Sequence, residues 1–189
     1  MKSFRALLTL LAAVAFATPA FADRLGTDRA EDRDANNSIF IEAGGPGLLY
    51  SVNYERIVEN DFGLRIGASY TSLSASAGGS SASAAFTTIP VIASYLGLRG
   101  GNHILELGVG GTAVYASGAA SGTGLAASGS GMMALGTALI GYRRQPVNGG
   151  FQFRIGLEAL VGKGLALSNP DPNSLGVLPW MYMSLGFSL

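Results

Sequence analysis

From residue 38 to residue 189, the chain is built of short segments in which apolar residues alternate with polar or small ones. In the clearest segment, 62–72, one parity holds small or polar residues and the other holds Phe62, Leu64, Ile66, Ala68 and Tyr70. Successive side chains of a β-strand point to opposite faces, so this period of two predicts strands with one apolar face. The same alternation recurs in residues 151–163.

We predict eight strands, separated by turn-forming residues, at 38–44, 48–57, 62–72, 85–98, 103–117, 131–144, 151–163 and 177–189. Short turns are expected at 58–61, 99–102 and 145–150, and longer loops at 73–84, 118–130 and 164–176. Pro90 lies inside the fourth strand, and because proline cannot donate to a strand ladder we expect a bulge there. The pattern leaves open which faces of the fourth and sixth strands are apolar.

The apolar residues are spread thinly over these strands. No stretch after residue 22 is apolar enough to cross a bilayer as a helix, although the mean hydropathy is +0.35. Only helices and closed barrels satisfy every backbone group in lipid, and eight is an allowed strand number for a bacterial barrel. The sequence therefore predicts an all-β fold, an eight-stranded antiparallel up-and-down transmembrane β-barrel over residues 38–189. Aromatic residues beside the short turns and the C-terminus fit an interfacial girdle: Tyr54, Phe62, Tyr95, Tyr142, Phe151, Phe153 and Phe187.

Residues 1–22 have the features of a signal peptide. Lys2 and Arg5 form a positive n-region, residues 6–16 form an apolar h-region, and residues 20–22 form an A-x-A cleavage site. The apolar run is too short for a transmembrane helix, which needs ~20 residues. Residues 23–37 are rich in charge and predict a flexible periplasmic segment. The expected location of the chain is the cell outer membrane.

Composition and charge narrow the chemistry. The chain has no cysteine, which excludes disulfides, cysteine-ligated zinc and cysteine nucleophiles. Its 12 basic and 12 acidic residues balance, and without Lys2 and Arg5 the acidic residues exceed the basic ones by two. We therefore expect no nucleic-acid partner. No cofactor or metal motif occurs, and we expect neither a cofactor nor a metal ion.

Two features of the chain resemble known proteins. Residues 41–56, IEAGGPGLLYSVNYER, resemble the first hairpin of outer-membrane barrel proteins with no assigned activity. The eight-strand layout over 38–189, the signal peptide and the hydrophobic last strand resemble small bacterial outer-membrane barrels of the OmpA, OmpX and OmpW type. The resemblance implies a monomer among outer-membrane lipid and lipopolysaccharide, with a C-terminal strand that the barrel-assembly machinery reads. Such barrels usually end in an aromatic residue, whereas this chain ends in Leu189 with Phe187 two positions before it.

The predicted strand faces direct six ionisable side chains into the barrel: Glu42, Glu55, Arg65, Glu106, Arg154 and Glu158. Eight strands leave an interior just wide enough for side chains to fill. We therefore expect a paired polar network that closes the lumen rather than an ion pathway, because unpaired charges there would be costly. The expected role is structural or surface-interactive, with the three longer loops as contact elements.

Two alternatives belong to other functional classes. A soluble periplasmic ligand-binding barrel would need apolar residues inside and polar residues outside, the opposite of the pattern in 62–72 and 151–163. A lipid-modifying outer-membrane enzyme would need a nucleophile, a base and an orienting group close together. The single histidine, His103, shares the parity of lipid-facing Leu105 and Leu107 and has no closely spaced serine after it. We expect no catalytic residues and no enzyme activity.

Overall fold

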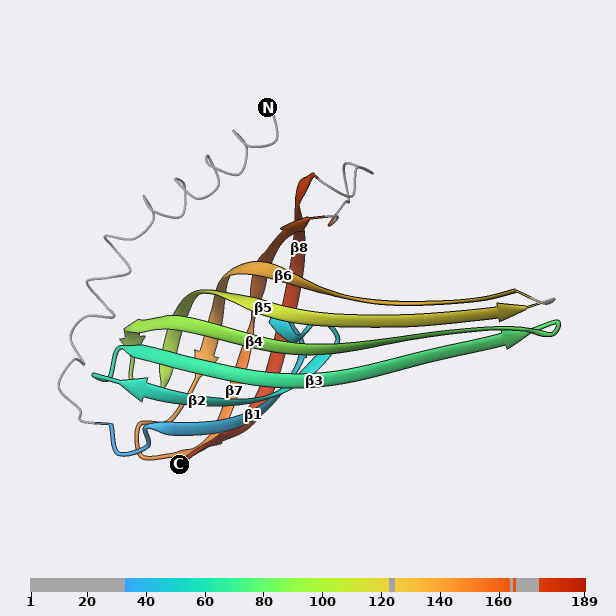
Figure 1. Ribbon diagram of the computed structural model, residues 1–189. Helices are drawn as coiled ribbons and strands as arrows, with labels where there is room; N and C mark the ends of the chain where they lie inside the picture. The colour runs from blue at the N-terminus through green and yellow to red at the C-terminus, as the bar shows by residue number, and fades with distance from the viewer. Residues whose placement is uncertain (1–32, 123–124, 164, 166–173) are drawn as a thin grey trace.

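The chain folds into a closed antiparallel barrel in which each strand pairs with its neighbours in sequence and the last strand pairs with the first (Figure 1). The structure is a computed structural model and describes residues 33–122, 125–163, 165 and 174–189. The strands are β1 Asn37–Gly44, β2 Tyr50–Val58, β3 Phe62–Ala77, β4 Ser80–Gly100, β5 His103–Gly122, β6 Leu125–Arg144, β7 Gly150–Lys163 and β8 Leu175–Ser188. The predicted eight-stranded up-and-down barrel is confirmed.

Side chains alternate strictly between the two faces of the barrel wall. Phe62, Leu64 and Ile66 are 51%, 57% and 52% exposed on the outer face, whereas Arg65 between them is 2% exposed inside. The apolar face therefore points outward and the charged face inward, as the sequence predicts. A soluble ligand-binding barrel would have the reverse arrangement. The sequence left the facing of β4 and β6 undecided. These strands follow the same rule, since Ile92 of β4 and Arg143 of β6 are buried inside the barrel.

The two ends of the barrel differ in construction. One end, here called the short-turn end, carries the connections β2–β3, β4–β5 and β6–β7 and lies beside the C-terminus (Figure 1). Its first turn has Glu59 and Asn60 in the left-handed region, with φ of 51° and 61°, which is the backbone that a tight hairpin turn requires. The short turns expected at 58–61, 99–102 and 145–150 all occur at this end.

The opposite end carries a four-stranded extension that the sequence did not predict. The expected loops at 73–84 and 118–130 are wrong, because β3 to β6 continue through them as strands (Figure 1). The last pair of β3 with β2 is Val52–Ala68, and the first pair of β6 with β7 is Gly136–Val161. Beyond these pairs the four strands pair only with one another, over 69–77, 80–88, 114–122 and 125–133. We call these residues the ribbon.

The ribbon forms although serine, alanine and glycine have weak strand propensity. Its backbone groups pair in continuous register, from Ser69–Thr88 to Ala77–Ser80 between β3 and β4. A two-residue turn, Gly78–Gly79, joins these strands with φ of 58° and 82°. Positive φ at both positions is the requirement for the hairpin turn that matches strand twist. Ladder pairing and turn geometry therefore outweigh the propensity of the individual residues.

Two further details differ from the sequence prediction. The bulge expected at Pro90 is wrong, because β4 keeps one register past it, and the shift against β5 lies between Tyr95 and Leu98. Proline is accommodated because the β3–β4 ladder is interrupted between Ile66–Val91 and Ser69–Thr88. The third expected loop, 164–176, lies mostly outside the described residues.

Candidate functional site

The barrel interior holds all six ionisable residues that the sequence analysis directed inward. Their side chains come from β1, β2, β3, β5 and β7, and every one of these residues is at most 5% exposed. The strand alternation places them there, because each is flanked in its strand by residues of the outer face.

Five of the six side chains take part in ion pairs across the lumen. Arg65 Nη1 lies 2.8 Å from Glu42 Oε2, which links β3 to β1. Arg154 Nη2 lies 2.6 Å from Glu55 Oε2, and its Nε lies 3.7 Å from Glu106 Oε2. Glu106 also accepts a hydrogen bond of 2.8 Å from Ser94 Oγ.

Sequence reasoning missed Arg143, which completes this set of charges. Its guanidinium is fully buried, pairs with Glu55, and lies 3.9 Å from Glu106 Oε2 through Nη1. Arg143 and Arg144 are consecutive in β6, so one of them has to point inward whichever register the strand takes. The two consecutive arginines therefore indicated one inward arginine, although the sequence did not show which face of the strand points inward. With Arg143 included, three glutamates face three arginines and their formal charges cancel.

An aromatic ring supports the arginine side of this network. The guanidinium carbon of Arg154 lies 4.1 Å from the ring centroid of Phe40, and that of Arg65 lies 5.8 Å from the same centroid. Phe40 is an inward residue of β1 and is 1% exposed. A ring within ~6 Å of a guanidinium group stabilises the cation without adding a charge.

Glu158 differs from the other inward acids. Neither of its carboxylate oxygens has a hydrogen-bond partner in the described part of the chain. Its neighbours in register are Leu139 of β6 and Trp180 of β8. Arg154, four residues earlier in the same strand, pairs with Glu55 and Glu106 instead. The structure therefore brings Glu158 into the interior, and among the residues that it describes Glu158 forms no ion pair.

The connection between β1 and β2 turns inward at the ribbon end. The residues of its short 3-10 turn, Gly45–Gly47, are buried inside the barrel mouth. Thr112 Oγ1 donates a hydrogen bond of 2.9 Å to the carbonyl of Pro46, and Trp180 Nε1 donates one of 3.1 Å to that of Leu48. Gly44 and Gly45 have φ of 70° and 71°, so the fold needs glycine at this reversal. The turn lies across the lumen above the charged network.

The short-turn end is closed by polar side chains. Gln145 Nε2 donates hydrogen bonds of 3.1 Å to Ser38 Oγ and 2.7 Å to Ser188 Oγ. Arg33, which precedes β1, is 4% exposed. Burial and the charges of Arg143 and Arg99 lower the pKa of Arg33 to about 10. Residues 33–36 are therefore packed against the barrel end, whereas residues 23–32 of the expected flexible segment, like the expected signal peptide, lie outside the described residues.

His103 lies on the outer face beside the turn at the short-turn end. Its Nδ1 is 2.6 Å from the hydroxyl of Tyr142, and it faces Arg144 across the β5–β6 ladder. Among the described residues, no three or more histidine, aspartate or glutamate side chains are grouped so that they could hold a metal ion. The described residues also include no helix of the length and apolarity needed to span a bilayer.

Several solved structures resemble this one. The crystal structure of Ail, the attachment invasion locus protein of Yersinia pestis, in complex with the heparin analogue sucrose octasulfate gives a TM-score of 0.50 at 12% identity, over 80% of this chain and 96% of that chain. A second crystal structure of Ail gives 0.48 at 14% identity, over 82% of this chain and 97% of that chain. The N-terminal β-barrel domain of Pseudomonas aeruginosa OprF gives 0.44 at 15% identity, over 82% and 100%.

No protein-family model matches the sequence, and no curated protein matches it. At these identities the likeness concerns the fold alone. The chain has the fold of the small eight-stranded bacterial outer-membrane β-barrels.

Proposed function

We propose that this chain is a bacterial outer-membrane β-barrel with a closed polar lumen and a role in surface interaction, neither an open pore nor an enzyme. The observation that carries the proposal is the inside-out wall, in which Leu64 and Ile66 face outward and Arg65 faces a buried ion pair. Water would not stabilise such an outer face, whereas hydrocarbon would. Residues 1–22 would direct export.

The height of the apolar outer face supports insertion in a membrane. On β3 it runs over the nine residues from Phe62 near the short-turn end to Tyr70, ~26 Å along the strand, which a tilt of about 40° reduces to a height of ~20 Å. Aromatic residues stand at both limits, with Tyr95 beside Phe62 at a ring-centroid distance of 5.5 Å. A tilted strand crosses the hydrocarbon with about 9–11 residues, and aromatic girdles at both limits are typical of outer-membrane barrels. The short-turn end would then face the periplasm.

The contents of the lumen support a closed barrel. Three glutamate–arginine partnerships span the interior, the turn at Gly45–Gly47 lies across one end, and Gln145 lies across the other. An ion could pass through the lumen only if these buried pairs separated. Each buried charge left without its partner costs several kcal/mol. We infer little conductance.

The ribbon is the element best placed for surface interaction. Its outer strands have no partner on one side, at 69–77 of β3 and 125–133 of β6, among the residues that the structure describes. Exposed strand edges pair readily with an extended chain, and most proteins block them with lysine or proline. Neither edge contains a charged residue or a proline. Contact with other molecules at the cell surface follows from this open construction.

The outer surface and the closed ring of the barrel indicate its partners. Lipid and lipopolysaccharide would surround the barrel, and the C-terminal strand, with Phe187 and Leu189 on its outer face, would be read by the assembly machinery. We propose a monomer, since the strands already close the ring. Enzyme activity is not proposed, because outward His103 has Tyr142 and Arg144 beside it and no serine, threonine or carboxylate among its described partners.

Three measurements test this proposal. Cell fractionation should recover the protein in the outer membrane, and folded protein should migrate differently from boiled protein on a gel. Planar bilayers containing the purified barrel should show little steady conductance. Recovery in the soluble periplasm would contradict the membrane assignment, and a large stable pore would contradict the closed lumen.

A further inference from the structure

The outer face of the ribbon changes from large aromatic and apolar side chains to small serines and alanines between one transverse row of residues and the next. Tyr70, Thr87, Tyr115 and Met132 lie opposite one another in a transverse row, one residue from each of β3 to β6. The next three rows on the same face contain nine serines and three alanines: Ser72, Ala85, Ser117 and Ser130; Ser74, Ser83, Ala119 and Ser128; Ser76, Ser81, Ser121 and Ala126. We call these rows the serine face.

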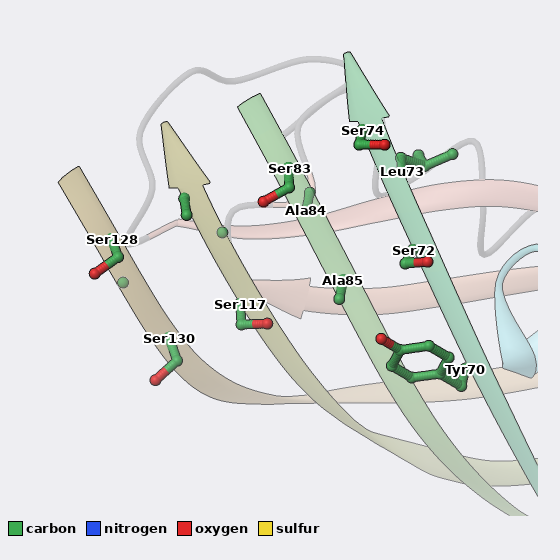
Figure 2. A pocket seen from close by; sticks show the side chains of 13 residues that line it. Tyr70, Ser72, Leu73, Ser74, Ser83, Ala84, Ala85, Ser117, Ser128 and Ser130 are labelled. Atoms are coloured by element: carbon green, nitrogen blue, oxygen red, sulfur yellow. The ribbon is translucent and has the colours of Figure 1, made fainter. Parts of the chain in front are cut away.

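The serine face is the direct continuation of the apolar outer wall. Residues of even number in β3 face outward from Phe62 to Tyr70, and the β3–β4 register does not change from Phe62–Tyr95 to Ala77–Ser80. Figure 2 shows the serine side chains on one side of the four strands, with Tyr70 at the base. The other side of the ribbon carries a row of four alanines, Ala75, Ala82, Ala120 and Ala127.

A shallow hollow of about 660 Å³ lies over the serine face. Its lining includes Ser72, Ser83, Ser117 and Ser128, and Tyr70 closes its lower edge (Figure 2). No described residue of the ribbon carries a charge. The hollow therefore offers hydroxyl donors and acceptors beside an aromatic ring, and it offers no cation for a phosphate or sulfate.

We propose that the serine face binds the sugar headgroups of glycolipid in the outer leaflet. This inference rests on the proposed function, since only insertion in the outer membrane places these rows next to the outer leaflet. The row of Tyr70 and Tyr115 ends the apolar band, so the serines begin at the level where hydrocarbon gives way to headgroups. They face away from the barrel axis, toward the surrounding lipid.

The side chains suit neutral sugars. Each serine hydroxyl can donate one hydrogen bond and accept others, as each sugar hydroxyl can, so the two surfaces are complementary without charge. Tyr70 and Tyr115 are 60% and 45% exposed, and such rings offer an apolar face with a polar tip at a membrane interface. In the described structure only Ser81 and Ser121 of the serine face hydrogen-bond to each other through their side chains, at 2.8 Å.

The test compares three vesicle compositions: phospholipid alone, phospholipid with lipid A, and phospholipid with lipopolysaccharide that carries its core sugars. The quantity measured is the temperature at which the folded, heat-modifiable gel band disappears. We expect core-bearing lipopolysaccharide to raise this temperature above the lipid A value by roughly 2–4 °C, the shift that a modest stabilisation gives in a chain of this size.

Two variants locate the effect. Replacing Ser83, Ser117 and Ser128 together by alanine removes hydroxyls from the serine face, and this variant should lose the increment. A matched control, Ala82→Ser with Ala120→Ser, adds hydroxyls to the opposite face and should keep it. An equal temperature with lipid A and with core-bearing lipopolysaccharide, or an increment that persists in the triple variant, overturns the inference. Wild-type protein with no heat-modifiable band in any vesicle contradicts the proposed function itself and this inference with it.

Discussion

Arg154 of β7 and Glu55 of β2 meet inside the barrel, with 2.6 Å between Nη2 and Oε2 and no exposure of either side chain. Their strands are not neighbours in the wall, since β8 and β1 lie between them. The pair therefore ties opposite parts of the barrel together through its interior. Glu55 has the same role toward Arg143, so one carboxylate compensates two buried guanidinium groups.

Glu55→Gln should destabilise the barrel strongly. The substitution keeps the volume of the side chain. Among the described residues, Arg143 and Arg154 would then form ion pairs with Glu106 alone, whose Oε2 lies 3.9 Å from Arg143 Nη1 and 3.7 Å from Arg154 Nε. Breaking a buried pair by removing one partner costs about 3–5 kcal/mol. Urea unfolding in vesicles measures this loss, and an unchanged free energy of unfolding would show that the interior is hydrated rather than dry.

Glu158→Gln should have the opposite result and serves as the matched control. The carboxylate of Glu158 has no hydrogen-bond partner among the described residues, and burying an unpaired charge is unfavourable. The amide removes that charge at constant size, so the free energy of unfolding should stay the same or rise. A loss as large as that for Glu55→Gln would reveal a cationic partner for this carboxylate.

Ile155→Arg should destabilise the inserted barrel by ~2–4 kcal/mol if the residue lies near the bilayer midplane. Ile155 is 47% exposed on the outer face of β7, so the arginine would replace an apolar side chain in contact with lipid. Ser83→Arg, on the outer face of the ribbon beyond the apolar band, is the control and should change stability little in phospholipid vesicles without lipopolysaccharide. Equal effects of the two substitutions would place Ile155 outside hydrocarbon.

Gly78→Val and Gly79→Val should loosen the tip of the β3–β4 hairpin. Both glycines have positive φ and open space around the position of a Cβ, so the penalty comes from the backbone alone, about 1–2 kcal/mol per residue. Gly129→Val has the same open space without positive φ and is the matched control. Hydrogen exchange of the ribbon amides should quicken in the first two variants only; equal protection in all three would contradict the turn geometry.

The period of two in residues 62–72 was enough to predict the outward direction of Leu64 and the inward direction of Arg65, and its recurrence along residues 38–189 predicted the barrel. It worked because the apolar outer face and the charged interior of the barrel impose opposite requirements on alternate residues. The ribbon could not be predicted in this way. Its serines and alanines are all small and uncharged, so the hydropathy contrast that marks a strand is weak there. The turn residues Gly78–Gly79 were the remaining signal for a hairpin.

The interior network was predicted in part for a similar reason. Glu106 and Arg154 lie in strands with clear alternation, whereas Arg143 lies in β6, where Gly, Ala and Thr blur the two faces. The inward course of Gly45–Gly47 depends on two distant residues: Thr112 donates a hydrogen bond to the carbonyl of Pro46, and Trp180 donates one to the carbonyl of Leu48. Contacts between residues that are far apart in the chain produce no periodic pattern in the sequence.

The bare margins of the ribbon have a consequence for binding. The ribbon projects beyond the residues that close the barrel, so each margin is free of the ring (Figure 1). An extended peptide can add to either margin as a further strand while all eight pairings of the barrel stay in place. The sheet is therefore extendable although the barrel is closed.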